Sequence, residues 1–311
     1  MAEPIAVTAF ALDAMSGWPA RVYRVIGHPV GGFARVISAC ETRWNRPARP
    51  EARRRLLGLV TLGLLIALSG GTALIVERVI YGVAGPWAWL LVAIAAWPAL
   101  ALRSLLDHYA PILSALSRGD LPAARRAVGM IVGRDTDALD EQAVCRAAIE
   151  SLSESFCDGV IAPLFWLLVL GLPGIWAYKA INTADSMIGH PEEPLRAFGW
   201  ASARCDDLAN WLPARLSGAL ICLAGGGGWR VLRRDHAKHA SPNAGWPEAA
   251  MAGALGIRLA GPLHYDGVLT AKPFIGEGGE PDLGTMRKAR AVFIRACLLA
   301  SLSAGGVEWL L

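Results

Sequence analysis

Residues 56–76 read LLGLVTLGLLIALSGGTALIV, a stretch of 21 positions without a charged side chain. Because about 20 apolar residues in a helix suffice to cross the hydrocarbon core of a bilayer, this stretch predicts a membrane-spanning helix. The 24 uncharged residues of Val79–Leu102 predict a second span. Arginines at positions 53–55 precede the first stretch, and the positive-inside rule places that end of the helix in the cytoplasm.

The uncharged run Gly159–Tyr178 has the length of a span, but Pro163 and the sequence GLPG at 171–174 interrupt it. If this run crosses the membrane fully, the polar segment 179–215 lies outside the cytoplasm. If the run is re-entrant, that segment is cytoplasmic. The prolines favour the re-entrant interpretation.

The whole chain has fewer charged residues than soluble proteins carry. Its 311 residues are 54% hydrophobic and 18% charged, against roughly 25% charged in soluble domains, and its mean hydropathy is +0.39. With 30 basic and 26 acidic residues the net charge is only +4, which disfavours a nucleic-acid-binding role. The six cysteines are scattered without paired spacing, which argues against a disulfide scaffold.

The periodic stretches are rich in alanine and leucine, and alternating runs of β-branched residues are absent. Two further apolar runs, Leu216–Trp229 and Ala296–Val307, are too short to span comfortably, so we expect tilted, re-entrant or bundle-packed helices. The predicted fold is all-α: a polytopic helical membrane protein with about four to five spanning or re-entrant helices and amphipathic cytoplasmic helices. No linker divides the chain, so residues 1–311 are predicted to form a single integral membrane domain.

Carboxylates gather where a polar helix meets an apolar run. Thr136 is predicted to cap a helix that continues to about Phe156. Glu150, Glu154 and Asp158 follow at intervals of four, which stacks three carboxylates on one helix face. A solvated acidic face is the ordinary explanation. At a membrane boundary, however, uncompensated acids are costly, and a divalent cation such as magnesium would compensate them.

Two more clusters combine carboxylates or amides with basic residues. Residues 179–186 read KAINTADS, in which Asn182 and Asp185 share a helix face. Residues 204–210 read RCDDLAN, in which Asp206 lies four positions before Asn210. Each cluster alone fits a capped helix end or a surface salt bridge equally well. Together they have the composition of a metal-phosphate site, with carboxylates for the cation and Lys or Arg for phosphate oxygens.

Other common site motifs are missing. The chain has neither a P-loop sequence nor a G-x-G-x-x-G fingerprint, so a nucleotide would be held by neither of these phosphate loops. The four glycines at 225–228 fit a turn or close helix packing better than a phosphate cradle. His236 and His239 have no acidic or cysteine partner positioned for a zinc site.

A series of short motifs follows over about residues 13–280. They read GHPV (27–30), GRDT (133–136), RAAIES (146–151), DGVIAPLFW (158–166), KAINTADSMIG (179–189), Arg204 with DD (206–207), PARL (213–216) and SPNAGWPEAA (241–250). In their sequences and in their order along the chain, these motifs resemble those of the adenosylcobinamide-phosphate synthases of cobalamin biosynthesis. Two positions depart from the family pattern: Ala34-Arg35 replaces the usual Gly-Arg, and Glu154-Ser155 replaces the usual Glu-Asn, so no ligand role is carried over to position 155.

The resemblance implies a membrane-bound ligase that forms a carbon–nitrogen (amide) bond. It would join a propionate carboxylate of adenosylcobyric acid to the amine of aminopropanol or aminopropanol phosphate, giving adenosylcobinamide or its phosphate. It would use ATP and Mg²⁺, because a carboxylate reacts with an amine only once its oxygen becomes a leaving group, as in an acyl phosphate. Phosphoryl transfer in turn depends on positioning and charge neutralisation.

The resemblance also assigns candidate site residues. A pool of carboxylates is expected to bind magnesium: Glu150, Glu154, Asp158, Asp185, Asp206 and Asp207. Asp185, Asp206 and Glu248 are the candidate catalytic residues, and the amine proton would go to Glu248 or to a carboxylate of the pool. The candidate substrate-binding residues, of which the basic ones would hold phosphates or the corrin's peripheral groups, are His28, Arg134, Asp135, Thr136, Lys179, Asn182, Ser186, Arg204, Arg215 and Asn243.

Because ATP is cytoplasmic, the active site is expected to face the cytoplasm, which agrees with the re-entrant topology. The resemblance therefore predicts a multi-pass protein of the bacterial inner (plasma) membrane, in contact with the lipid bilayer and a corrinoid substrate and without nucleic acid.

Two other functions stay open from the residues alone. A transporter would place acids at mid-span, whereas these acids lie at the borders of apolar runs. A non-catalytic membrane sensor of related fold would not need three clusters of acids and bases. The sequence leaves open which amino alcohol is used, whether it is phosphorylated, how many helices cross fully, and whether the protein is a monomer or a homo-oligomer.

Overall fold

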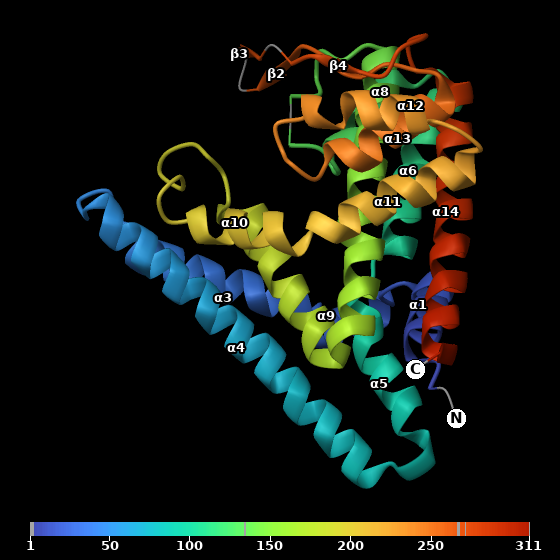
Figure 1. Cartoon of the computed structure of the whole chain (residues 1–311). Coiled ribbons are helices and arrows are strands. Elements are labelled where there is room, and N and C mark those ends of the chain that lie inside the picture. Colours follow the sequence, from blue (N-terminus) through green and yellow to red (C-terminus); the bar gives the residue numbers. More distant parts are fainter. Residues whose placement is uncertain (1–2, 134, 266–267, 271, 311) are drawn as a thin grey trace. The chain divides into compact units, whose positions relative to one another are not determined.

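The structure, a computed structural model, describes residues 3–133, 135–265, 268–270 and 272–310. These residues are almost entirely helical, with two small antiparallel ladders (Figure 1), so the predicted all-α fold is confirmed. The chain folds into two compact units, and each unit is built from segments that are not contiguous in sequence. The first unit comprises 1–101, 162–210 and 303–311, and the second comprises 102–161 and 211–302. The expected single membrane domain stays a prediction.

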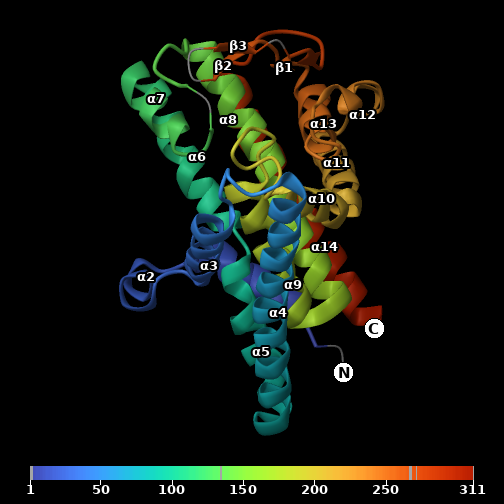
Figure 2. The same ribbon diagram turned by 90° about the vertical axis from the view of Figure 1, so that its left-hand side faces the viewer.

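The first unit is organised around the long helix α4. Helix α4 packs against α3 and α9 (Figure 2), and α1 packs against α5. Leu65, Ile188 and Phe198 belong to the buried core that α4 shares with α3, α9 and α10. The helices of this unit are α1 Ile5–Ser16, α2 Ala20–Ile26, α3 Pro29–Trp44, α4 Glu51–Val83, η1 Gly85–Trp87, α5 Ala88–Ala96, η2 Trp97–Ala99, α9 Ala162–Ile188 and α10 Trp200–Ala209.

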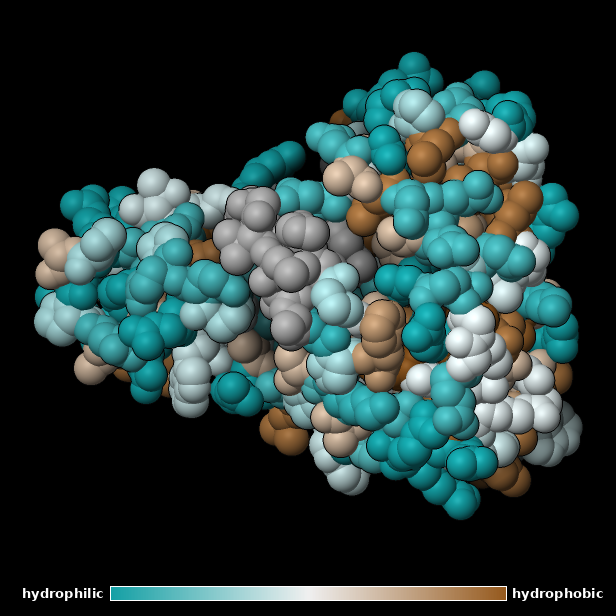
Figure 3. Space-filling view, turned by 90° about the horizontal axis from the view of Figure 1, so that it is seen from above, coloured by the Kyte–Doolittle hydropathy of each residue, from teal (hydrophilic) through white to brown (hydrophobic). Residues whose placement is uncertain are grey.

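The second unit contains two sets of packed helices. Helix α13 packs against α11, α12 and α8, and α6 packs against α7 and α8. The helical elements are α6 Leu102–Ser117, α7 Leu121–Gly129, α8 Glu141–Phe156, the π-helical turn η3 Cys157–Ile161, α11 Trp211–Gly225, α12 Trp229–Asp235, η4 His236–Lys238, α13 Gly245–Leu255 and most of α14 Leu283–Leu310. Figure 3 looks onto the face that carries the loops and strands of this unit, where hydrophilic residues are common.

Short strands are present where the sequence predicted none. β1 Leu259–Ala260 pairs with β4 Phe274–Ile275, and β2 Leu263–Tyr265 pairs with β3 Val268–Thr270, both antiparallel. Each strand has only two or three residues, which is too short for an alternating hydrophobic pattern to be visible.

Among the described residues, four stretches of helix are long and apolar enough to cross a membrane: Glu51–Val83, Gly85–Ser117, Glu141–Ile188 and Leu283–Leu310. The chain is therefore a polytopic helical membrane protein, as predicted. The decisive stretch 56–76 lies within the first of them, in the middle of α4. The run Leu216–Trp229 falls largely in α11, which has 15 residues and is one of the shorter apolar helices.

The predicted second span, Val79–Leu102, is wrong in its boundaries. Helix α4 ends at Val83, and the chain turns at Gly85, whose φ of 52° lies in the left-handed region that favours glycine. Pro86 follows directly. The second apolar stretch instead begins at Gly85 and continues through η1, α5 and η2 into α6.

The expectation that Ala296–Val307 is too short to span is also wrong, because its helix α14 extends far beyond the uncharged run. The flanking charged residues are accommodated by partners. Arg295 Nη1 donates to the Ala224 carbonyl at 3.1 Å in the second unit. In the first unit the Glu308 carboxylate accepts hydrogen bonds from the backbone N–H groups of Ala6 and Val7.

Helix α9 reverses direction at Gly171 (Figure 1). The φ of 65° and ψ of −154° at this residue divide the helix into two arms. The arms touch, because a Cβ added at Gly174 would lie 2.3 Å from the carbonyl oxygen of Trp166. Ala162 on the first arm and Tyr178 on the second belong to one buried cluster. This reversal is the geometry that the re-entrant interpretation of Gly159–Tyr178 requires, and the side of the membrane stays a prediction.

A carboxylate from α4 stabilises the reversal. The Leu172 backbone N–H, at the start of the second arm, donates to Glu77 Oε1 at 3.0 Å. The first N–H groups of a helix have no partner within the helix, and the positive end of the helix dipole favours a carboxylate there. Pro173 next to it has no N–H to satisfy and suits a helix start.

The glycines at 225–228 form a turn with close helix packing, as predicted. Gly225 ends α11, and a Cβ there would lie 2.6 Å from the Cβ of Ala254 on α13. Gly228 precedes α12 with a φ of 97°, which requires glycine.

We expect Gly174→Ala to destabilise the first unit by about 1–3 kcal/mol, because the new methyl group has no space against the backbone of Trp166. Gly71→Ala on α4 is the matched control, since nothing lies within 4 Å of the added Cβ there. It should be neutral or stabilising by up to about 1 kcal/mol. The measurement is the apparent Tm of the detergent-solubilised protein, and equal shifts in the two variants would contradict the tight turn.

Candidate functional site

A polar cavity of about 160 Å³ lies in the second unit. Helix α8 contributes Glu150, Ser151 and Glu154, and the start of α13 contributes Glu248. The remaining lining residues are Ile131, Val132, Gly133, His239, Ala260 and Lys272. The structure thus brings together three of the predicted site residues, Glu150, Glu154 and Glu248, although Glu248 lies about a hundred positions from the others in sequence.

Two of these carboxylates are deeply buried. Glu150 is 6% exposed and Glu248 is 4% exposed. Glu150 Oε1 accepts a hydrogen bond from the Ala260 backbone N–H at 2.7 Å. Burying a charged carboxylate is costly without such partners. The cavity therefore concentrates negative charge where a cation or a proton donor would be stabilised.

His239 lines the same cavity and was not assigned a site role by the sequence. Its Nδ1 accepts a hydrogen bond from the Ser241 backbone N–H at 3.0 Å, and its Nε2 lies 3.7 Å from Glu248 Oε1. Burial lowers the pKa of His239, and the charge of Lys272 lowers it further. The lowered pKa favours the neutral ring, and because Nδ1 acts as an acceptor, the proton of the neutral ring lies on Nε2, the nitrogen closer to Glu248.

Lys272 is a second cavity residue that the sequence analysis missed. His239 stands two positions before the SPNAGWPEAA motif, whereas Lys272 stands two positions before β4, a strand that the sequence did not predict. Proximity to that motif was a usable signal for His239. Lys272 carried no local signal, because its place in the cavity depends on the strand pairing.

An ion-pair network centred on Asp235 holds these two segments in place. Asp235 is fully buried; Arg234 Nη2 lies 2.7 Å from its Oδ2 and Lys238 Nζ lies 2.8 Å from its Oδ1. Its Oδ2 also accepts from the Gly276 backbone N–H at 2.8 Å, and Lys238 donates to the Phe274 carbonyl at 3.2 Å. The network therefore links the segment just before His239 to the strand just after Lys272.

The start of α8 differs from the prediction. The N-cap is Asp140, whose Oδ1 accepts from the Ala143 N–H at 2.7 Å, and not Thr136. Thr136 lies in the preceding turn, close to Gly129 of α7. An aspartate caps as well as a threonine, so local preference did not distinguish them. Asp135 and Thr136 do not line the cavity, and Arg134 lies outside the described residues.

Asp158 is not among the cavity-lining residues. It lies in the π-helical turn η3, which follows α8 directly. A π-turn has more residues per turn than an α-helix. The four-residue spacing from Glu154 therefore does not keep Asp158 on the same helix face, and of these three carboxylates Glu150 and Glu154 line the cavity.

The other predicted acids form a cluster in the first unit. Asp206 on α10 is 9% exposed; its Oδ2 accepts from Asn210 Nδ2 at 2.9 Å, and its Oδ1 faces Asn182 Nδ2 at 3.4 Å. Asn210 Oδ1 in turn accepts from the Tyr178 hydroxyl at 3.0 Å. Burial raises the pKa of Asp206 well above its usual range, and the neighbouring Asp185 carboxylate raises it further. The structure thus brings Asp206 close to Asn182 and Asp185, which the sequence analysis had placed in a different cluster.

Asp207 and Arg204 form a separate, more exposed pair. Arg204 Nη1 lies 3.1 Å from Asp207 Oδ2, one turn apart on α10.

Lys179 and His28, two other predicted site residues, also lie in the first unit. Burial lowers the pKa of His28, and the positive charge of Lys179, on the second arm of α9, lowers it further. His28 itself caps α3, because its Nδ1 accepts from the Val30 N–H at 3.2 Å. The Ser186 hydroxyl donates to the Asn182 carbonyl of its own helix at 2.9 Å.

Arg215 and Asn243 lie in the second unit but outside its cavity. The Arg215 guanidinium stacks over the rings of Trp211 and Trp246, at 4.2 and 4.7 Å from their centroids. Asn243 is 6% exposed and sits in a turn in which its backbone N–H donates to the Ser241 hydroxyl at 3.2 Å. This turn leads into α13 and so positions Glu248.

Among the described residues, no group of three or more His, Cys, Asp or Glu side chains is arranged to hold a metal ion. Magnesium is usually bound through one or two carboxylates, with water and substrate phosphates completing the shell. Pairs such as Asp185 with Asp206, or Glu150 with Glu154, supply ligands of the right chemistry. The magnesium assignment therefore stays a prediction.

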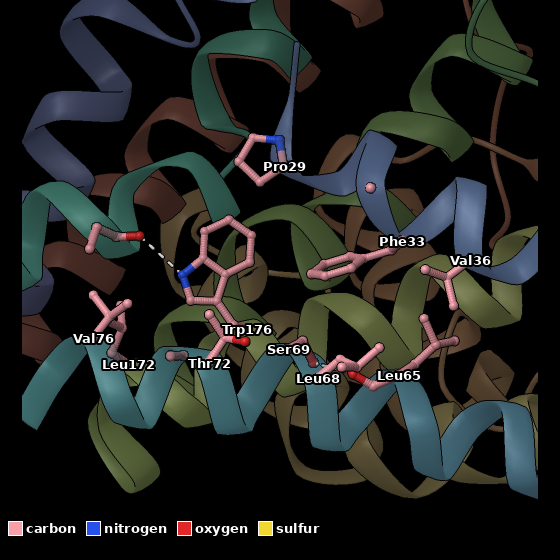
Figure 4. A pocket seen from close by; sticks show the side chains of 13 residues that line it. Pro29, Phe33, Val36, Leu65, Leu68, Ser69, Thr72, Val76, Leu172 and Trp176 are labelled. Carbon is pink, nitrogen blue, oxygen red and sulfur yellow. Dashed lines mark hydrogen bonds between the residues drawn. The ribbon is translucent and has the colours of Figure 1, made fainter. Parts of the chain in front are cut away.

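The first unit also contains an apolar cavity of about 480 Å³ between α3, α4, α5 and α9 (Figure 4). Phe33 and Trp176 line it together with side chains of α4 such as Leu65 and Leu68. Trp176 Nε1 donates to the Ala95 carbonyl at 3.0 Å, which fixes the indole at the cavity wall. No charged residue lines this cavity, so it suits an apolar group and supplies no acid–base chemistry.

We expect Asp235→Asn to flatten the acid sensitivity of the protein. The Arg234 guanidinium holds the pKa of Asp235 well below its usual range. The ionised Asp235 carboxylate stabilises the fold fully at pH values above about 3.9, the pKa of an aspartate in the unfolded chain. This stabilisation is lost as the pH falls toward the lower pKa of Asp235 in the folded protein. Thermal unfolding between pH 6 and 3 should show a lower Tm for the variant at pH 6 and a smaller fall on acidification.

Asp107→Asn serves as the control for this prediction. Asp107 is exposed and pairs with Arg103 one turn away on α6. Its substitution should leave both the Tm and the acid sensitivity close to those of the unchanged protein. An equally steep fall for the Asp235→Asn variant would contradict the assignment.

Comparison with known proteins places the chain in a family. The CobD/Cbib protein family matches residues 6–293. The chain is 48% identical to the cobalamin biosynthesis protein CobD of Rhodobacter capsulatus over 295 residues, 93% of this chain and 92% of that protein. It is 46% identical to CobD of Rhizobium meliloti strain 1021 over 94% of this chain and 93% of that one.

Similarity extends to CobD of Geobacter metallireducens, at 42% identity over 97% of this chain and 96% of the relative. No solved structure gives a significant match. A match that covers nearly the whole chain, at this identity to several curated proteins, confirms the resemblance drawn from the motifs. The chain belongs to the CobD/Cbib family.

Proposed function

We propose that the protein acts in cobalamin biosynthesis as a ligase that forms an amide bond, joining adenosylcobyric acid to aminopropanol or aminopropanol phosphate with ATP and Mg²⁺. The observation that carries the proposal is the family match over residues 6–293, with relatives named cobalamin biosynthesis protein CobD. The two polar clusters support it, since each contains a buried carboxylate and the cavity of the second unit also contains a lysine.

The proposed chemistry has two steps. ATP phosphorylates a propionate carboxylate of the corrinoid, which gives an acyl phosphate and ADP. The amine then attacks the acyl carbon and phosphate leaves. Both steps develop negative charge on phosphate oxygens, which basic side chains and a magnesium ion stabilise.

Side chains of both units have matching chemistry for these steps. In the first unit Asp185, Asp206 and Asp207 would bind magnesium, and Lys179 and Arg204 would hold phosphate oxygens. In the second unit Glu150 and Glu154, with Asp158 beyond the cavity, offer further oxygen ligands. Buried Glu248 is the proposed acceptor of the amine proton.

The proposal extends to the location of the protein. The four apolar helices suit a membrane, and we propose the bacterial inner membrane with the polar clusters facing the cytoplasm, where ATP is available. The apolar cavity beside α4 and the lipid-facing helices would then lie within the bilayer.

The central test is an assay of the purified protein with adenosylcobyric acid, ATP and Mg²⁺, comparing aminopropanol, aminopropanol phosphate and ethanolamine phosphate. We expect a corrinoid amide and one ADP per amide with at least one amine, and no product after removal of Mg²⁺ with EDTA. Mass spectrometry of the corrinoid and ADP release are the measurements. Absence of product with every amine would overturn the proposal and favour a transporter or a sensor.

We expect Asp185→Asn and Asp206→Asn each to lower the rate of amide formation by about 10²-fold, because each removes a charge proposed to bind magnesium. Asp107→Asn is the matched control and should leave the rate unchanged, since Asp107 is exposed and pairs with Arg103 of its own helix. Rates near those of the unchanged protein in both cluster variants would refute the metal assignment for the first unit.

A further inference from the structure

We propose that His239 is a positioning residue for Glu248, fixing that carboxylate to accept the proton of the amine substrate. The inference rests on the proposed function, because it needs an amine that loses a proton. It goes beyond that function by assigning a role to a histidine and by locating the amine-activating step in the polar cavity of the second unit.

The orientation of the His239 ring is fixed from one side. The Ser241 backbone N–H donates to Nδ1 at 3.0 Å, so Nδ1 acts as an acceptor. A neutral imidazole with Nδ1 as acceptor carries its proton on Nε2. Nε2 lies 3.7 Å from Glu248 Oε1, and both side chains line the cavity. The ring can therefore donate toward Glu248 but has no free lone pair with which to act as the base itself.

The surroundings of His239 act on its protonation in both directions. Burial, the largest effect, and the positive charge of Lys272 lower the pKa of the ring, whereas the hydrogen bond from Ser241 and the charge of Glu150 raise it. Glu150 and Glu154 are the other charged residues that line the cavity. Their negative charge favours the protonated form of Glu248, and an N–H donor at His239 Nε2 favours the ionised carboxylate instead.

His236 does not offer the same role. Its ring stacks against Trp246 with centroids 4.1 Å apart, and its Nδ1 lies 3.0 Å from the Leu232 carbonyl oxygen of the preceding helical turn. It is not among the residues that line the cavity. Of the two histidines in this segment, only His239 faces Glu248.

The proton and electron balance of the step is simple. The substrate ammonium gives one proton to the Glu248 carboxylate, which becomes neutral. The freed amine lone pair forms the C–N bond at the acyl phosphate, and the C–O bond to phosphate breaks with its electron pair. The second amine proton leaves with the phosphate as hydrogen phosphate, and Glu248 later returns its proton to water. His239 changes no protonation state in this sequence.

The test compares His239→Leu with His239→Gln in the full-length protein. The Gln amide retains an N–H donor, whereas Leu retains only bulk. We expect kcat to fall about 10- to 100-fold in the Leu variant, with the KM for ATP and for the corrinoid unchanged, and to stay within about threefold in the Gln variant. The acid limb of the kcat–pH profile should move to higher pH in the Leu variant, because the carboxylate has lost a donor.

Two controls accompany the test. His190→Leu removes an exposed histidine of the first unit and should leave kcat and its pH profile unchanged. His239→Leu combined with Glu248→Gln should be no slower than Glu248→Gln alone, because His239 is proposed to act only through Glu248. A Gln variant as slow as the Leu variant, a loss confined to KM, or an unmoved acid limb would each overturn the proposal.

A spectroscopic readout separates this proposal from the proposed function. In protein labelled with ¹⁵N-histidine, the His239 ring should be neutral with its proton on Nε2 at pH 7, and Glu248→Gln should shift the Nε2–H resonance. If the unchanged protein makes no amide, the proposed function fails on its own assay. If Glu248→Gln leaves the resonance unmoved, the pairing of His239 with Glu248 is wrong whatever the activity.

Discussion

The reversal of α9 at Gly171 is the constraint on which the first unit depends. A helix can turn back within a few residues only where one residue adopts a left-handed backbone and the exposed amides find an acceptor. Gly171 provides the backbone and Glu77 of α4 provides the acceptor. The second arm then carries Asn182 and Asp185 to the Asp206 carboxylate on α10.

The buried acids show how an apolar chain keeps charged groups. Each is satisfied in a different way: Asp206 by the side-chain amides of Asn210 and Asn182, Asp235 by two basic side chains and a backbone amide, and Glu150 by the Ala260 amide. The differences matter chemically. Asp235 is fully neutralised by permanent charges and so is structural. Among the described residues the hydrogen-bond donors to Asp206 are the neutral amides of Asn182 and Asn210, which leaves the carboxylate able to interact with a cation or a proton.

The two units provide different kinds of surface. The first offers an apolar cavity among long helices and a carboxylate–amide cluster at the ends of α9 and α10. The second offers a small polar cavity with carboxylates, a histidine and a lysine. The reaction proposed above, between a large amphipathic corrinoid, a nucleotide and a small amine, would use both kinds of surface.

Much of this was determined by the sequence alone. The length of the stretch 56–76 predicted α4, the GLPG break predicted the interruption of α9, and the spacing of Asn182 and Asp185 predicted that both lie on one helix face, because these features depend on neighbours along a helix. Tertiary structure decided the rest. The π-turn at Cys157–Ile161 removed Asp158 from the face of Glu154, and Arg295 and Glu308 found partners that let α14 continue as one helix. His239 and Lys272 joined Glu248 and Glu150 only through a strand pairing and an ion-pair network that connect distant segments, and no local pattern encodes such contacts.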